Sequence, residues 1–346
     1  MTQPIAITLG DPAGIGPEII AKAFRDAPAL TRGCFVAGDV GAIRRAAQML
    51  AVPGLPVAEI TSPAQVGDVP PNCIPVLQVT APLAGIAIGQ VSAEAGRAAA
   101  DAVTWAARAA LRGDIAALVT APLHKEALSA AGVPYPGHTE LLQAEAAAHL
   151  GRQIAEVPVR MMLANDELRT VLVSIHMALR QAIDAVTFDN VLQTLRITDA
   201  SLRAMLGRRP RIGVAGLNPH AGEGGLFGRE EIDTIVPAIR AALAEGLDVH
   251  GPFAPDTVFM RARAKGDQPG EFDAVVAMYH DQGLIPVKYL GVDKGVNVTL
   301  GLPLVRTSPD HGTAFDIAGT GRADAASLVE ALRMARRLAG VDVSSA

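Results

Sequence analysis

A repeated succession of strand-like, loop-like and helix-like segments restricts the fold of this sequence more than any other feature. Each repeat has a short apolar run, a loop rich in Gly, Pro and polar residues, and a segment with apolar residues at helical spacing. The first repeat reads IAITLG, DPAGIG and PEIIAKAFRDA over residues 5–27. This alternation is typical of βα units on a largely parallel sheet. We therefore predict an α/β fold.

Further apolar runs predict four more strands, each ending in polar residues. They lie at residues 115–120, 169–175, 211–217 and 273–278. An Ala-rich helix is expected over residues 93–111, and its small residues at i, i+3 and i+4 spacing predict close packing against a neighbouring element. Because 346 residues exceed what one core holds comfortably, we expect two domains, or one large α/β domain with an elaborated half.

Composition and charge exclude several classes of protein. The formal net charge of -5 provides no basic surface that would hold nucleic acid by counterion release. No apolar run approaches the roughly 20 residues of a membrane span, and the start MTQPIAITLGDP lacks the features of a signal peptide. We expect a cytoplasmic protein that binds neither membranes nor nucleic acids. Cys34 and Cys73 are interpreted as packing residues.

Four of the eight histidines follow predicted strands, namely His124, His176, His220 and His280. In open α/β sheets, ligands bind beyond the carboxyl ends of the strands. Any one of these histidines is more simply a hydrogen-bonded structural residue, but their shared placement predicts a site. A catalytic zinc-like ion needs three protein ligands and an open position, which three imidazoles would supply. Asp281 either orients the ring of His280 or is a solvated side chain at a strand end.

Three loops are candidates for binding. GDPAGIGPE, at residues 10–18, resembles an anion cradle before a helix but matches no phosphate-binding fingerprint, so a plain turn is the alternative. NPHAGEGGLFG, at residues 218–228, has glycines that would let the backbone approach a ligand, or it is a flexible turn. In YPGHTE, His138 and Thr139 contact a substrate, or Thr139 caps the helix that follows.

Polar residues near the C-terminus complete the inventory. Lys288, Asn297 and Arg306 have the donors that a phosphate or carboxylate requires, although exposed surface charges are the simpler interpretation. The segment DHGTAFDIAGTGRAD, at residues 310–324, is by composition only a polar, Gly-rich loop.

Taken together, eight blocks resemble the 4-hydroxythreonine-4-phosphate dehydrogenases of pyridoxal phosphate biosynthesis. They occur in the family's order over nearly the whole chain. The blocks are GDPAGIGPE, TAPLHK, GHTE, LNPHAGEGG, GPFAPDT, MYHDQG, GVNVTLGLP and RTSPDHGTAFDIAG.

The resemblance implies a fold and an assembly. The expected subunit has two domains in three α/β/α layers, like the isocitrate and isopropylmalate dehydrogenases, with the active site in the interdomain cleft. Residues 1–130 and 305–346 would form a discontinuous cofactor-side domain, and residues 131–304 the metal, substrate and dimerisation domain. A homodimer would share the metal site across its interface.

The resemblance also implies roles for individual residues. The metal ligands would be His176, His220 and His280, with His280 coming from the partner subunit, while His124 would be an active-site neighbour. Substrate contacts would be made by His138, Thr139, Lys288, Asn297 and Arg306. The cofactor would be bound by Gly312, Thr313, Asp316 and Asp324. Catalytic roles would fall to His280, Asp281 and Lys288.

The implied cofactors are NAD or NADP and a divalent metal ion, Zn²⁺, Mg²⁺ or Co²⁺. The implied reaction oxidises 4-phosphohydroxy-L-threonine to 2-amino-3-oxo-4-phosphooxybutanoate, which decarboxylates to 3-amino-2-oxopropyl phosphate. The segment SIHMALRQAI departs from the family's usual sequence around the first ligand, and residues 195–209 align poorly. Alternatives are a paralogue that oxidises 4-phospho-D-threonate or 4-phospho-D-erythronate, a paralogue acting on cyclic diols, a metal-dependent hydrolase or phosphotransferase, and a binding protein without turnover.

Overall fold

The computed structural model describes residues 3–50, 55–291 and 294–341. The chain forms two compact units, one made of residues 1–158 with 302–346 and the other of residues 159–301. The helix at residues 138–150 thus lies in the first unit, whereas residues from 131 onward were expected in the second. Residues 1–2 and 342–346, at the ends of the expected cofactor-side domain, lie outside the described residues.

The first unit contains a parallel sheet with the strand order β3-β4-β2-β1-β5-β12. The central strand β1 pairs in parallel with β2 and with β5, so that Ile5 is level with Cys34 and with Ala117. The parallel arrangement predicted from the βα repeats is confirmed here. The strands are β1 (Ile5–Thr8), β2 (Cys34–Gly38), β3 (Val57–Ile60), β4 (Ile74–Gln78), β5 (Ala117–Thr120) and β12 (Arg306–Pro309).

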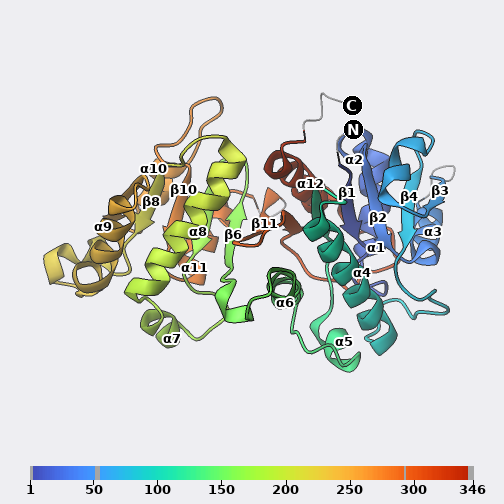
Figure 1. Ribbon diagram of the computed structural model, residues 1–346, viewed down its shortest axis with the longest axis horizontal. Coiled ribbons are helices and arrows are strands. Elements are labelled where there is room, and N and C mark those ends of the chain that lie inside the picture. Colours follow the sequence, from blue (N-terminus) through green and yellow to red (C-terminus); the bar gives the residue numbers. More distant parts are fainter. Residues whose placement is uncertain (1–2, 51–54, 292–293, 342–346) are drawn as a thin grey trace. The chain divides into compact units, whose positions relative to one another are not determined.

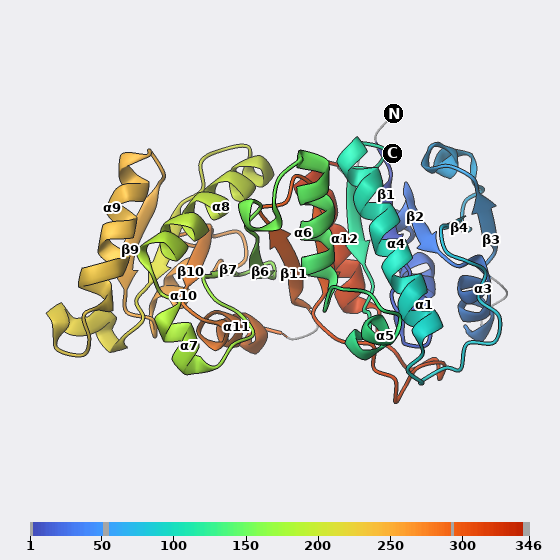
Figure 2. The ribbon, with the colours of Figure 1, turned by 60° about the horizontal axis from the view of Figure 1, so that its bottom comes forward.

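Helices cover both faces of this sheet. α1 packs with α3 and α12 on one face, and α4 packs with α5 and α6 on the other (Figures 1 and 2). The helical segments are α1 (Gly16–Asp26), α2 (Pro28–Thr31), α3 (Val40–Met49), η1 (Pro63–Asp68), α4 (Ala93–Arg112), α5 (Lys125–Ala130), α6 (His138–Leu150), η2 (Ile154–Glu156) and α12 (Ala326–Ala339).

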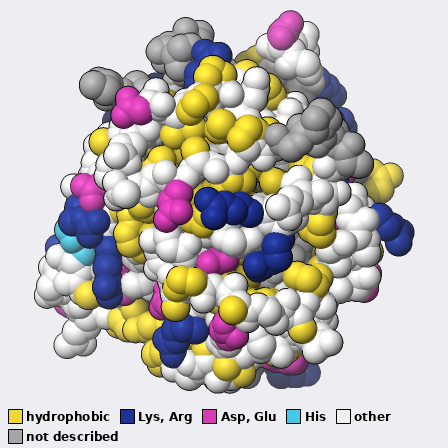
Figure 3. All heavy atoms as spheres, turned by 90° about the vertical axis from the view of Figure 1, so that its right-hand side faces the viewer, with side chains coloured by type: hydrophobic (Ala, Val, Ile, Leu, Met, Phe, Trp, Pro, Cys, Tyr) yellow, Lys and Arg dark blue, Asp and Glu magenta, His cyan; other side chains and the backbone are white. Residues whose placement is uncertain are grey.

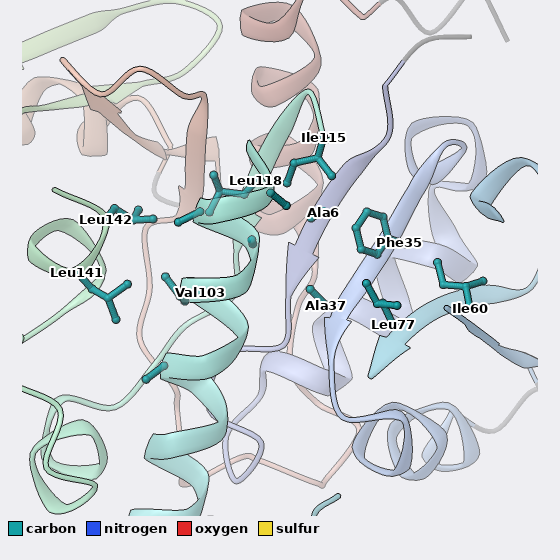
Figure 4. Packing of buried hydrophobic residues seen from close by; sticks show 14 of the residues in the cluster. Ala6, Phe35, Ala37, Ile60, Leu77, Val103, Ile115, Leu118, Leu141 and Leu142 are labelled. Atoms are coloured by element: carbon teal, nitrogen blue, oxygen red, sulfur yellow. The ribbon is translucent and has the colours of Figure 1, made fainter. Parts of the chain in front are cut away.

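The core of the first unit lies between α4 and the sheet. Figure 4 shows Phe35 and Leu118 from the strands in this cluster with Val103 from α4. The close packing predicted for the Ala-rich helix is confirmed, because a Cβ atom on Gly96 would lie 2.0 Å from the carbonyl oxygen of Ala127 on α5. The start of α4 is fixed by the Ser92 hydroxyl, which accepts a hydrogen bond from the Ala95 N–H.

The second unit contains a mixed sheet with the strand order β11-β6-β7-β10-β8-β9. β6 runs antiparallel to β11 and β7, whereas β7, β10, β8 and β9 pair in parallel. The strands are β6 (Arg160–Ala164), β7 (Arg169–Leu172), β8 (Ile212–Ala215), β9 (Val249–Phe253), β10 (Ala274–Ala277) and β11 (Val296–Leu300). The strands expected at 169–175, 211–217 and 273–278 are therefore confirmed as β7, β8 and β10.

Helices also flank the second sheet. α8 packs with α9 against one face, and α10 and α11 contact β10 on the other (Figure 1). The segments are α7 (Leu179–Asp184), α8 (Phe188–Leu206), η3 (Pro219–Gly225), η4 (Glu231–Ile235), α9 (Val236–Ala244), α10 (Val258–Ala262) and α11 (His280–Tyr289). The poorly aligned residues 195–209 include the last turns of α8, which ends at Gly207 in a left-handed conformation.

Two surface properties bear on function. Among the described residues, no helix combines the length and hydrophobicity needed to cross a membrane. On the face of the first unit shown in Figure 3, acidic and basic side chains are interspersed among apolar ones.

Candidate active site

Three of the predicted site histidines follow strands that are neighbours in the second sheet. β10 lies between β7 and β8 and is parallel to both, so its carboxyl end is at the same edge as theirs. His176 follows β7, His280 follows β10 and His220 follows β8. The ring centroids of His176 and His280 are 5.6 Å apart. The sequence-based expectation that these strand ends gather histidines at one edge is thus confirmed for β7 and β10.

His280 is the first residue of α11 and has its carboxylate partner beside it. Its Nδ1 atom is 2.7 Å from Asp281 Oδ1, which leaves Nε2 to face a ligand. A metal-bound imidazole usually donates its other N–H to such a partner, and the bond fixes the tautomer and the ring orientation. Of the two interpretations of Asp281, the orienting role agrees with this contact, although the carboxylate is also 71% exposed.

Gln282 joins the end of β10 to the end of β8. Its side-chain amide donates to the Gly216 carbonyl at 2.8 Å, and its side-chain oxygen accepts from the Met278 N–H at 2.7 Å. No sequence pattern indicates a role for Gln282. Its two hydrogen bonds set the loop that follows β8 against the strand that precedes His280.

The loop that carries His220 has an unusual backbone. Residues 220–224 all have positive φ, including the non-glycine residues His220, Ala221 and Glu223. Such a run is costly and persists only where surrounding contacts fix it. Gly222, at φ +80°, approaches Glu231 so closely that a Cβ atom would lie 2.7 Å from its Oε2. Close contacts with Glu231 therefore accompany this conformation of the loop.

Glu231 is the residue that fixes this loop, and sequence reasoning missed it. Its buried carboxylate accepts hydrogen bonds from the Leu217 N–H at 2.7 Å, the Asn218 N–H at 2.7 Å and the Asn218 side-chain amide at 2.9 Å. A negative charge can stay buried here because several donors surround it. The only sequence signal was an acidic pair at the start of a helix, which is common and unspecific.

Removing Glu231 should loosen the His220 loop. We expect Glu231→Ala to lower the free energy of unfolding by at least about 2 kcal/mol, because three donors lose their acceptor. Where His220 serves as a zinc ligand, zinc affinity should fall by roughly 10- to 100-fold, the usual effect of losing an orienting group. Denaturant unfolding and zinc calorimetry measure both changes. Glu230→Ala is the matched control because Glu230 accepts from the Asn218 side chain, whereas the Leu217 and Asn218 N–H groups donate to Glu231, so equal effects from both variants would contradict this role.

Within one chain, the described residues do not place three or more His, Cys, Asp or Glu side chains around a common point. His220 packs its ring near Phe227, with centroids 6.2 Å apart, and all three histidines are at least partly exposed. His280 was expected to come from a partner subunit, yet in a single chain it already lies beside His176.

The first unit holds a separate cluster around the buried cation Arg306. Arg306 is 4% exposed, and its Nε and Nη2 atoms donate to the Thr120 hydroxyl at 3.1 and 2.8 Å. Burial lowers the pKa of Arg306 to about 10, although the charge of Glu140 partly opposes that effect. A buried guanidinium bonded to Thr120, the last residue of β5, provides the donors for a phosphate or carboxylate. Sequence reasoning interpreted Arg306 by itself as an exposed surface charge, and its burial contradicts that interpretation.

His138 lies beside this cation, and burial and the cation both favour its neutral form. Burial, together with the nearby charge of Arg306, lowers the pKa of His138 well below its usual value, while a hydrogen bond with the Ala121 backbone opposes the shift. The ring is only partly buried, but its Nε2 atom is buried and has no hydrogen-bond partner among the described residues. A neutral imidazole with a buried nitrogen beside Arg306 can bind a polar group of a ligand.

The other predicted substrate residues are placed as follows. Thr139 lies in the first turn of α6, whose cap residue is Gly137, so the interpretation of Thr139 as the helix cap is wrong. Lys288 lies in the last turn of α11 and Asn297 on β11, both in the second unit.

The predicted cofactor loop packs on the turn that follows β1. The Ile15 N–H donates to the Thr313 carbonyl at 3.0 Å, and a Cβ atom on Gly14 would lie 2.9 Å from the Thr313 side chain. Gly312 faces open space and Asp316 is exposed. Asp324 accepts from the Ala326 N–H at 2.9 Å at the start of α12, which is a structural contact.

Two residues of α1 anchor the end of this loop. The buried Glu18 accepts from the Ala323 N–H at 2.8 Å and from the Gly321 N–H at 3.3 Å. Lys22, in an ion pair with Glu18 at 3.1 Å, donates to the Gly321 carbonyl at 2.7 Å. No local sequence pattern indicates this anchor, because it joins residues about 300 positions apart.

Known proteins are similar to this chain over most of its length. The family model described as "Pyridoxal phosphate biosynthetic protein PdxA" matches residues 31–335. The chain is 52% identical over 338 residues to a 4-hydroxythreonine-4-phosphate dehydrogenase from Beijerinckia indica subsp. indica, covering 98% of this chain and 96% of the relative. It is 45% identical over 343 residues to a D-threonate 4-phosphate dehydrogenase from Salmonella typhimurium, covering 98% and 99%.

A crystal structure of a 4-hydroxythreonine-4-phosphate dehydrogenase from Klebsiella pneumoniae has a TM-score of 0.85 to this chain at 41% identity, covering 98% of this chain and 100% of that one. The residues that the family model matches include the strand-end histidines and Arg306 described above. The chain therefore belongs to the PdxA family of pyridoxal phosphate biosynthetic proteins and is a dehydrogenase.

Proposed function

We propose that this chain oxidises 4-phosphohydroxy-L-threonine to 2-amino-3-oxo-4-phosphooxybutanoate with NAD(P)⁺ and a divalent metal ion, as a step of pyridoxal 5'-phosphate formation. The names of its relatives support a phosphorylated four-carbon substrate. The observation that carries the proposal is the pair of adjacent imidazoles, His176 and His280, with Asp281 bonded to the second.

The donors at the β7 and β10 ends fit a divalent ion. Two imidazoles 5.6 Å apart, one of them bonded through Nδ1 to a carboxylate, are a chemically suitable part of a His₃ site for Zn²⁺ or Co²⁺. We propose that a His220 ring completes the set and that the site is shared between two copies of the chain. Mg²⁺ prefers oxygen ligands, so the histidine set favours the softer ions.

Exposed apolar side chains beside the histidines support the proposed homodimer. Met177 and Leu179 follow His176, Leu226 follows His220, and Ile285 and Tyr289 share α11 with His280; they are 45%, 59%, 74%, 63% and 90% exposed in one chain. Large apolar side chains gathered around a site are typical of surfaces that a partner covers.

Arg306 and its neighbours are proposed to bind the substrate phosphate. The guanidinium is already oriented by Thr120, and an incoming anion would offset the cost of keeping the cation buried. His138, being neutral, is proposed to bind a hydroxyl or the amino group of the substrate together with Thr139. Lys288 and Asn297 are also proposed to contact the substrate.

The residues of the chain would position the substrate and receive its proton. When bound, the divalent ion would act as a Lewis acid on the C3 hydroxyl, and NAD(P)⁺ would accept the two electrons. Lys288 is proposed to take part in transferring the proton that the hydroxyl releases, and Asp281 to hold the His280 ring in position. The product is a β-keto acid, whose carbonyl accepts the electron pair when CO₂ leaves, so the protein needs no further group for that step.

The nicotinamide cofactor is proposed to bind in the first unit along Gly312, Thr313, Asp316 and Asp324. Two observations fit a bound group there. The anchored loop lies against the β1 turn, and buried polar atoms of that turn have no hydrogen-bond partner within the described part of the chain.

A side-by-side assay tests the proposed substrate. Purified protein with Zn²⁺ or Co²⁺ should reduce NAD⁺ or NADP⁺, followed at 340 nm, with 4-phosphohydroxy-L-threonine as substrate. The alternative substrate is 4-phospho-D-threonate, which the name of the Salmonella relative favours. A kcat/KM at least tenfold higher for the D-threonate ester would replace the proposal with that alternative. Phosphate release without reduction of either cofactor would support a hydrolase instead.

A further inference from the structure

Four polar atoms at the carboxyl ends of β1 and β5 are buried without a hydrogen-bond partner among the described residues. They are Thr8 Oγ1, Asp11 Oδ2, His124 Nδ1 and His138 Nε2. Buried polar groups are nearly always paired, so a cluster of such atoms indicates a ligand or bound water. His138 belongs to the proposed substrate pocket, whereas Asp11 and His124 have no role so far.

Asp11 is held rigidly with one oxygen left over. The side chain is fully buried, and its Oδ1 atom accepts from the Ala13 N–H at 2.8 Å. Its own N–H donates to the Pro122 carbonyl at 2.8 Å, which ties the β1 turn to the segment that leads to His124. Burial raises the pKa of Asp11, while the Ala13 hydrogen bond and the nearby charge of His124 oppose that shift. Asp11 and His124 therefore interact electrostatically, although no hydrogen bond joins them.

The surroundings place this pair between the cofactor loop and the substrate pocket. On one side, the His124 ring stacks on Phe315 with centroids 4.7 Å apart and an angle of 16° between the planes. Thr313, two residues earlier, contacts the same β1 turn. On the other side, Ala121 contacts Gly10 of the turn and hydrogen-bonds through its backbone with His138. The reacting end of a dinucleotide must lie where its binding loop meets the substrate.

We propose that Asp11 and His124 form the subsite for the carboxamide of the nicotinamide ring. The carboxamide N–H would donate to Asp11 Oδ2, and its oxygen would accept a hydrogen bond from His124 Nδ1. One amide group thus supplies both the donor and the acceptor that the two orphaned atoms require. This inference rests on the proposed function, because it assumes that a nicotinamide dinucleotide is the cofactor.

The proposal makes a specific prediction about cofactor analogues. Nicotinic acid adenine dinucleotide has a carboxylate in place of the carboxamide, so Asp11 should repel it. We expect calorimetry to show at least about tenfold tighter binding of NAD⁺ than of this analogue to the wild-type protein. In Asp11→Asn the preference should fall to within about threefold. ADP-ribose lacks the nicotinamide ring, so it should bind the wild type and Asp11→Asn with equal affinity. Equal affinity for ADP-ribose would show that the variant is folded.

A second pair of measurements tests His124. His124→Phe keeps an aromatic ring for stacking on Phe315 but removes the donor, whereas His124→Asn keeps a donor. Thionicotinamide adenine dinucleotide carries sulfur, a weak acceptor, in place of the amide oxygen. We expect wild type and His124→Asn to bind NAD⁺ more tightly than this analogue, and His124→Phe to bind the two alike.

The control is Asp39→Asn, another buried carboxylate of the same unit. Both of its oxygens are already bonded, to the Ala42 N–H, the Gln78 amide and the Leu83 N–H, so its replacement should leave the preference among analogues unchanged. The proposal fails if Asp11→Asn keeps the wild-type preference, or if its affinity for ADP-ribose falls as much as its affinity for NAD⁺. If wild type binds neither NAD⁺ nor NADP⁺, the proposed function fails as well, which separates the two results.

Discussion

Replacing His280 by alanine should reduce kcat by on the order of 10³-fold while the protein remains folded. A bound divalent ion supplies several kcal/mol of charge stabilisation, and about 4 kcal/mol corresponds to about 10³-fold in rate. The His280 side chain is 38% exposed and begins a helix, so its removal leaves no cavity in the core. Steady-state kinetics with added Zn²⁺ or Co²⁺, together with the metal content after dialysis, measure the effect.

His250 provides a matched control for His280. It is also partly exposed and is also paired with an aspartate, since His250 Nε2 lies 2.7 Å from Asp248 Oδ1. It lies on the edge strand β9, away from the β7 and β10 ends. We expect His250→Ala to keep wild-type kcat and metal content. Full activity and full metal content in His280→Ala would remove His280 from the proposed ligand set.

Much of the second unit's site could be predicted from the sequence because its signal is local. A short apolar run followed by a histidine predicts both a strand and the position of its carboxyl end, as in the runs that precede His176 and His280. The parallel order β7-β10-β8 then brings these ends to one edge. The left-handed backbone around His220 could not be predicted, because it depends on contacts with Glu231, which lies in another element.

The first unit was predicted less completely because its polar residues are buried by distant segments. Asp11 is only a turn residue in the sequence, and it becomes buried because the segment around Pro122 packs over it. Arg306 is similar, since its burial depends on β5, nearly 190 positions earlier. A boundary near residue 130 was expected, but the contacts of α6 with α4 place it in the first unit. Contacts of this kind have no local sequence pattern.

The second large effect is expected at Arg306. Arg306→Ala should lower kcat/KM by on the order of 10³-fold, because a phosphate would lose two charge-assisted hydrogen bonds of about 2 kcal/mol each. Arg306→Lys keeps a charge but not the planar fork, so we expect a smaller loss of about 10- to 100-fold. Calorimetry with inorganic phosphate should show the same order: wild type, then the lysine variant, then the alanine variant.

The pKa of His138 tests for the Arg306 charge without depending on catalysis. Because the charge of Arg306 contributes to the low pKa of His138, that pKa should rise in Arg306→Ala and change little in Arg306→Lys. An NMR titration of the His138 ring would follow it. Arg160→Ala is the matched control, since Arg160 is a partly buried arginine whose Nε donates to the Thr194 hydroxyl at 2.7 Å, and burial lowers its pKa as well. Equally tight phosphate binding by Arg306→Ala and Arg160→Ala would contradict the phosphate role of Arg306. The loss of Arg306 would then affect phosphate binding no more than the loss of another arginine that is bonded to a threonine.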